Sequence, residues 1–217
     1  MGLALEVGIL ADLKEADAEG FAYFKEQFGI LNQVLSDAGL GTHVEPEELD
    51  EVFSRGMYGY SGLHYLRRIG AYLALGRPIP LPGDKEAARD PVLERDYWNR
   101  FLAGERLKYQ HLIVHSDAEG FYVPIDFEGA LVAIDIPLLG GMLGSTQRLR
   151  AECIELASVL GVPAGMDAEA DEIMNAVETQ GQGREKWQQY AVETFTCLQL
   201  IEACDASLRT KAAIVLV

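Results

Sequence analysis

The residues with the most chemical potential lie close together, in residues 109–127. This segment has two runs of apolar residues around an acidic turn with a glycine, a pattern typical of a β-hairpin. An imidazole beside a carboxylate can serve as a general base. The alternative is a histidine whose ring is satisfied by backbone groups at the end of a hairpin. The titratable side chains gathered here are His111, His115, Asp117, Glu119 and Asp126.

A metal site formed by the two histidines is disfavoured by their spacing. His111 and His115 are four residues apart. On a strand they would share a face but lie about 13 Å apart, at about 3.3 Å per residue. Ligands of one ion must be much closer. We therefore expect neither a metal nor a cofactor. The catalytic alternative is a hydrolase that uses His115 with Asp117 or Asp126.

A glycine-rich segment, residues 140–145, precedes a helical pattern. Backbone N–H groups at such a place can hold an anion, and Arg148 or Arg150 could assist. The segment lacks the lysine of a P-loop and does not match the dinucleotide-binding fingerprint. We therefore expect an ordinary connection into a helix, with Ser145 or Thr146 as the N-cap.

The charge of the chain restricts its partners. It has 34 acidic and 18 basic residues, a formal net charge of -16. Such a charge repels the phosphates of nucleic acids and anionic membranes, so we expect neither as a ligand. A basic protein would be attracted. The alternative is that the acids only keep the protein soluble.

The expected contacts with a basic partner are acids and exposed aromatic residues. The acids lie in residues 45–51, in the turn near residue 118, and in an acidic helical pattern over residues 167–179. Tyrosines near two arginines add possible anchors, because tyrosine and arginine are frequent in interfaces. Solvated faces and helix packing are the alternatives. The predicted contacts are Glu47, Glu48, Asp50, Glu51, Tyr58, Tyr60, Asp117, Glu119, Asp171 and Glu172.

The periodicity of apolar residues predicts a single α+β domain over residues 1–217, with helices packed on a small mixed or antiparallel sheet. Residues 43–45 could be a short further strand, and residues 47–51 the first turns of a helix. The expected strands are 3–9, 109–116, 121–127, 131–136 and 212–217. The expected helices are 16–38, 61–75, 90–103, 146–160, 167–179 and 184–206.

No stretch approaches the roughly 18 apolar residues that span a bilayer, and the first residues lack the basic region of a signal peptide. The three cysteines are odd in number and have no metal-type spacing. Free thiols of this kind fit a reducing compartment. We therefore expect a cytoplasmic protein.

Residues 109–160 resemble a family of uncharacterised bacterial proteins. The resemblance rests on the His-Ser-Asp turn at His115, the Tyr-Val-Pro-Ile-Asp run that ends at Asp126, and the glycine-rich segment before a helix. It implies no catalytic residue. Small acidic proteins of this class are often immunity partners of bacterial toxins, and this analogy concerns the class alone.

The functional hypothesis is therefore an acidic binding protein that neutralises or regulates a basic partner, for example a toxin, in the manner of an immunity protein. Its negative surface would speed the encounter with a cationic surface. Two alternatives stay open. One is the hydrolase described above, and the other is a structural subunit of a larger assembly, suggested by the apolar C-terminal residues 212–217.

Overall fold

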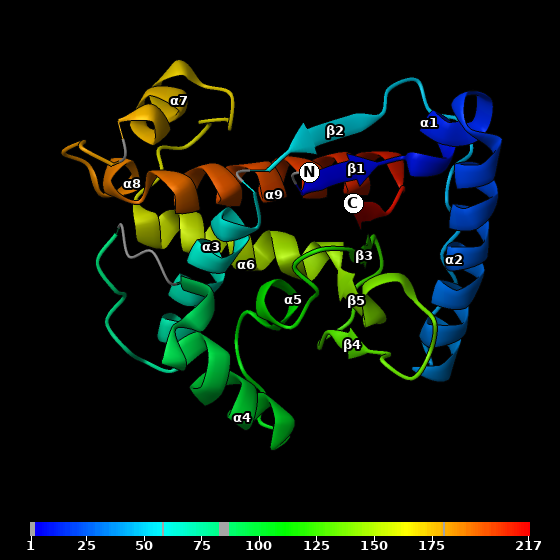
Figure 1. Ribbon diagram of the computed structural model, residues 1–217, viewed down its shortest axis with the longest axis horizontal. Coiled ribbons are helices and arrows are strands. Elements are labelled where there is room, and N and C mark those ends of the chain that lie inside the picture. Colours follow the sequence, from blue (N-terminus) through cyan, green and yellow to red (C-terminus); the bar gives the residue numbers. More distant parts are fainter. Residues whose placement is uncertain (1–2, 58, 83–86, 180) are drawn as a thin grey trace.

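The computed structural model describes residues 3–57, 59–82, 87–179 and 181–217, with the backbone alone at residues 59–61 (Figure 1). Its strands form one mixed sheet in the order β2-β1-β6-β3-β5-β4. Neighbours are antiparallel except β3 and β5, which are parallel. The strands are β1 (Ala4–Val7), β2 (Phe53–Gly56), β3 (Gly120–Val123), β4 (Leu131–Val132), β5 (Met142–Ser145) and β6 (Ile214–Leu216).

Helices make up much of the rest of the described chain, and the α+β fold predicted from the sequence is confirmed. The helices are α1 (Ile9–Ala16), α2 (Ala18–Asp37), α3 (Gly59–Ala74), α4 (Trp98–Leu102), α5 (Gln110–Ile113), α6 (Thr146–Leu160), α7 (Asp171–Glu178), α8 (Lys186–Gln189) and α9 (Ala191–Thr210). Shorter turns are η1 (Ala87–Arg89), the π-helical η2 (Val92–Tyr97) and η3 (Leu139–Gly141).

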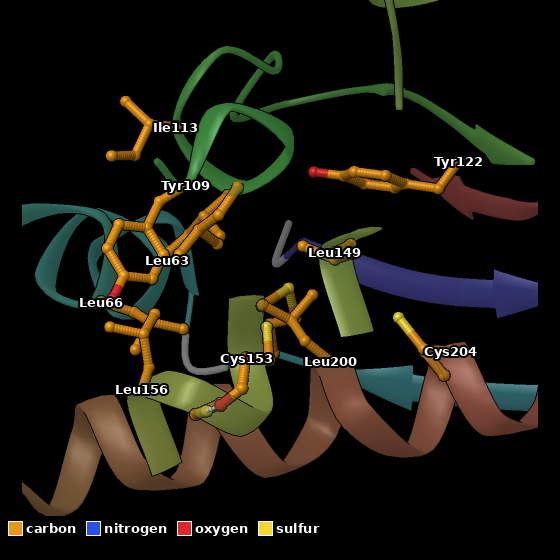
Figure 2. Packing of buried hydrophobic residues seen from close by; sticks show 14 of the residues in the cluster. Leu63, Leu66, Tyr109, Ile113, Tyr122, Leu149, Cys153, Leu156, Leu200 and Cys204 are labelled. Atoms are coloured by element: carbon orange, nitrogen blue, oxygen red, sulfur yellow. Dashed lines mark hydrogen bonds between the residues drawn. The ribbon is translucent and has the colours of Figure 1, made fainter. Parts of the chain in front are cut away.

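Side chains that alternate along the central strands fill a core on each face of the sheet. On one face, Tyr122 of β3 and Ile214 of β6 join a cluster with buried residues of α3, α6 and α9. Figure 2 shows Leu149 and Cys153 of α6 with Leu200 and Cys204 of α9 in this cluster. The central strands are buried on both sides because a second layer covers the opposite face.

The second layer is α2. Phe121 of β3 and Val215 of β6 point to this side and cluster with Phe28, Leu31 and Leu35. The rings of Phe28 and Phe121 lie 5.3 Å apart between centroids. In Figure 1, α2 stands on one side of β3 and β5, while α6 lies on the other. The residues that α2 buries against the sheet thus recur at steps of three and four, as on one face of a helix.

The helix predicted over residues 16–38 begins earlier and is divided. The chain turns from β1 into α1 at Gly8, which has a left-handed φ of 91°. Asp17 then separates α1 from α2, because its carboxylate accepts the backbone N–H groups of Glu19 and Gly20. The C-terminal strand is confirmed, since β6 pairs with both β1 and β3.

Residues 40–52 form a strap without regular structure that runs back along α2 (Figure 1). The strand predicted at 43–45 and the helical turns predicted at 47–51 are wrong. Tertiary contacts hold the strap instead. Asn32 forms two hydrogen bonds with the backbone of His43, and the buried Glu45 accepts the backbone N–H of Ala213 at 2.7 Å. His43 Nε2 lies 2.6 Å from the same Glu45 oxygen.

The contact between Tyr122 and Gly144 gives a test of this packing. The two residues face each other across β3 and β5, and a Cβ atom at Gly144 would overlap the Tyr122 ring. We expect Gly144→Ala to lower the free energy of unfolding by about 1–3 kcal/mol, as measured by urea denaturation.

The matched control is Gly29→Ala on the exposed side of α2. A Cβ atom there has no neighbour within 4 Å, and alanine favours a helix by about 1 kcal/mol over glycine. We expect this variant to be slightly more stable than the wild type. Equal stability of the two variants would show that the Tyr122 ring does not fill the space above Gly144.

Candidate functional site

Residues 109–123 do not form the predicted hairpin. The first half, predicted as a strand over 109–116, is the short helix α5 followed by a turn, and only β3 is a strand. Both carboxylate oxygens of Glu152 accept backbone N–H groups at the start of α5, from His111 and Leu112. Arg67 donates to the carbonyl groups of Leu112, His115 and Ser116 at 2.7–3.0 Å. Side chains distant in sequence therefore fix this backbone.

His111 is a buried structural residue. Its Nδ1 accepts the backbone N–H of Ser145 at 3.0 Å, which leaves Nε2 to donate to the carbonyl oxygen of Glu128 at 3.3 Å. Burial lowers the pKa of His111 to about 4. The imidazole is therefore neutral at pH 7 and connects α5 to the start of α6.

His115 is also enclosed. Its ring stacks on that of Tyr122, with centroids 4.1 Å apart and an angle of 12° between the planes. Both of its nitrogens face carbonyl oxygens, Nδ1 that of Ser116 and Nε2 that of Phe121. Burial lowers the pKa of His115 to about 4. Neither nitrogen is open to a substrate.

The arrangement proposed for a hydrolase is not formed, because neither proposed carboxylate is a hydrogen-bond partner of His115. Asp126 forms a two-pronged ion pair with Arg148, and Asp117 pairs with His64 at 2.8 Å. His115 and the glycine-rich segment do meet, since His115 and Met142 line one cavity of about 290 Å³. The partly exposed imidazole at this cavity belongs to His64.

The glycine-rich segment connects strands and a helix and is not an anion cradle. It contains β5, and the Ser145 side chain accepts the N–H of Arg148 as the predicted N-cap of α6. Gly140 is required by close packing, because a Cβ atom there would overlap the carbonyl group of Glu119. Within the described ranges, no three His, Cys, Asp or Glu side chains are grouped to hold a metal ion.

Some of the acids predicted as contacts are paired with a lysine or histidine, and the others are not. Lys25 pairs with Glu47 and Lys14 with Glu48, so these two acids hold the strap against α1 and α2. Asp117 is occupied by His64. Tyr58 and the side chain of Tyr60 lie outside the described residues. The exposed acids without an ion pair to any described residue are Asp50, Glu51, Glu119, Asp171 and Glu172.

The net negative charge of the chain comes from its two ends. Residues 1–51 have 12 acids and 2 lysines, a net charge of -10. Residues 151–217 have 11 acids and 4 basic residues, a net of -7. Residues 52–150 have 11 acids and 12 basic residues, a net of +1. Counting charge by segment would have shown this from the sequence.

The N-terminal acids include a straight row on α2, which no sequence motif marks. Glu19, Glu26 and Asp37 are exposed. At 100° per residue they lie within about 20° of one line along the helix, over about 27 Å. The buried Phe28 and Leu35 lie on the opposite side of α2. These three carboxylates, called the acidic row, therefore point to solvent in line.

A group of the C-terminal acids lies on α7 and the segment before it. Asp171 and Glu172 are in the first turn of α7, and Asp167 and Glu169 precede them. Arg55 of the edge strand β2 pairs with Glu169 at 3.3 Å. In Figure 1, α7 and α1 lie beyond opposite ends of β2, along the same edge of the molecule.

A family model described as "Putative DNA-mimic protein" matches residues 1–216. The chain belongs to this family. No curated protein and no solved structure matches it. The prediction of a toxin immunity protein is wrong, because the family is described by DNA mimicry and by no relation to a toxin. In the described part of the chain, no helix has both the length and the apolar character needed to cross a bilayer.

The histidines give a test that separates a structural from a catalytic site. A folded-state pKa of about 4 against about 6.5 in the unfolded chain means that the unfolded state takes up protons first. Each buried histidine therefore contributes stability above pH 6.5 that is lost as the pH falls toward 4. Burial raises the pKa of Glu152 to about 8, which acts in the opposite direction, so global stability mixes both.

The clean measurement is a ¹⁵N–¹H NMR titration of the imidazoles. We expect His111 and His115 to stay neutral down to about pH 5, and His111 to carry its proton on Nε2. Titration of His115 near pH 6.5 would show a solvent-accessible ring and would contradict this structural role.

Proposed function

We propose that this protein binds the DNA-binding surface of a basic protein and excludes DNA from it. The observation that carries the proposal is that the net negative charge comes from the two ends of a chain whose middle has a net charge of +1. A coat that served solubility alone needs no such separation. The description of the family supports the same conclusion.

The acidic row gives the proposal a geometric basis. Proteins hold DNA mainly through lysine and arginine side chains that contact phosphates. The row spans about 27 Å, which is close to the ~34 Å turn of B-DNA. Asp12 and Glu15 of α1 and Asp50 and Glu51 of the strap add exposed carboxylates at this end of the molecule. A protein surface that binds one DNA strand would contact these carboxylates in place of phosphates.

The proposal also covers nucleic acid as a ligand and the location of the protein. The protein would not bind nucleic acid itself, because its acidic surfaces repel phosphates. We place it in the cytoplasm, where proteins that bind bacterial DNA work. The three cysteines, Cys153, Cys197 and Cys204, are free and buried, as fits a reducing compartment.

A matched pair of triple variants tests the role of the acidic row. The first variant is Glu19→Gln, Glu26→Gln and Asp37→Asn. The control is Glu105→Gln, Glu128→Gln and Asp135→Asn, which removes the same charge from exposed positions in the middle segment. Proteins captured from a bacterial lysate by the immobilised wild type are eluted with duplex DNA, and the Kd of one purified partner is measured for both variants.

We expect duplex DNA to elute the captured partner. The row variant should bind it at least about tenfold more weakly, since three contacts of about 0.5 kcal/mol each amount to that factor. The control variant should change the Kd less than about twofold. Equal losses in both variants would show that net charge alone acts, and failure of DNA to elute any partner would refute DNA mimicry.

A further inference from the structure

The cavity of about 290 Å³ that contains His64 lies outside both acidic ends of the chain. It is bounded by α3, by η2 and α4, by the turn after α5 and by the start of β5. Its lining combines carboxylates, an indole and apolar side chains. The residues that matter for its chemistry are His64, Glu94, Trp98, Ile113, Asp117 and Met142.

The carboxylate of Asp117 is held in place by the imidazole of His64. His64 Nε2 lies 2.8 Å from Asp117 Oδ2. Burial and the nearby Arg67 guanidinium lower the pKa of His64, so the imidazole is neutral at pH 7 and donates its Nε2 proton. A neutral donor orients a carboxylate without cancelling its negative charge. Glu94 supplies a second, exposed carboxylate at the same cavity.

Among the lining residues that the structure describes, the one strong cation is already engaged. Arg67 is only 4% exposed and donates to the backbone carbonyls of Leu112, His115 and Ser116. It therefore lies behind the cavity wall. The two carboxylates exceed it by one charge, so the cavity favours a cation.

The aromatic wall selects the kind of cation. Trp98 is partly buried and is fixed edge-on against Phe101, with ring centroids 5.7 Å apart. Indole is the aromatic group that attracts cations most strongly. A guanidinium is planar, weakly hydrated, stacks on aromatic faces and pairs with carboxylates through two N–H groups. An ammonium group carries the same charge, but it is not planar, is strongly hydrated and lacks the rigid pair of N–H groups that matches a carboxylate.

We propose that this cavity binds a guanidinium group, stacked near Trp98 and paired with Asp117. The group could belong to free arginine or to an arginine side chain within a polypeptide. Ile113 and Met142 would cover its methylene chain, as apolar surfaces do for arginine stems. The proposal is independent of the acidic row and does not require the partner described above.

The test uses the full-length chain and three small probes. Free arginine, N-acetylarginine methylamide and N-acetyllysine methylamide are titrated separately, with tryptophan fluorescence and calorimetry as readouts. Trp187→Phe removes the other indole, so that the fluorescence reports Trp98. We expect saturable quenching by at least one arginine probe, and binding of the lysine probe at least about fivefold weaker. Tighter binding of the methylamide than of free arginine would identify a polypeptide side chain as the natural source.

Two variants test whether binding of the probe depends on the carboxylate of Asp117. Asp117→Asn should weaken binding of the arginine probe at least about tenfold. Asp126→Asn is the control, because Asp126 pairs with Arg148 away from the cavity and should leave binding unchanged. Circular dichroism of both variants confirms that they fold. The proposal is overturned if no probe saturates, if lysine binds as well as arginine, or if Asp117→Asn binds like the wild type.

Discussion

The architecture depends on the pairing of the C-terminal strand β6 with both β1 and β3. β6 lies between β1 and β3 and is hydrogen-bonded to each. Its alternate side chains complete the cores on both faces of the sheet. It also brings the two acidic ends of the chain into one body, since β1 leads directly into α1 and α9 leads directly into β6. The strand order thus joins the two acidic ends of the chain through one sheet.

Concentrating negative charge has an energetic cost, because like charges destabilise a compact state. The strap shows how the chain offsets part of it. Lys14 and Lys25, the only basic residues among the first 51 apart from one histidine, pair with Glu48 and Glu47. Such exposed pairs stabilise the fold only weakly, because water and salt screen them. The more decisive anchor is the buried contact of Glu45 with the backbone of Ala213, which joins the strap to the end that precedes β6.

Features set by local sequence could be predicted. The strand at β1, the apolar face of α2 and the Ser145 cap of α6 follow from spacing and capping rules. The structure of residues 109–116 could not be predicted in this way, because a short apolar run fits a buried helix or a strand equally well. The choice was made by Glu152 and Arg67, which lie about 40 residues away on either side. The strand and helical turns predicted within the strap were wrong because its conformation also depends on distant residues, from Lys14 to Ala213.

The candidate surface follows from the helical spacing of acids and not from the cluster of histidines in residues 109–127. The histidines of residues 109–127 are buried structural groups, while the acids at positions 19, 26 and 37 align only when helical spacing is applied to them.

The most direct measurement is the fluorescence anisotropy of a labelled DNA duplex bound to the purified partner, as this protein is added. If the protein occupies the DNA-binding surface, anisotropy falls to the value of free duplex, and less protein is needed at low salt than at high salt. A rise in anisotropy, which reports a ternary complex of DNA, partner and protein, would contradict the account.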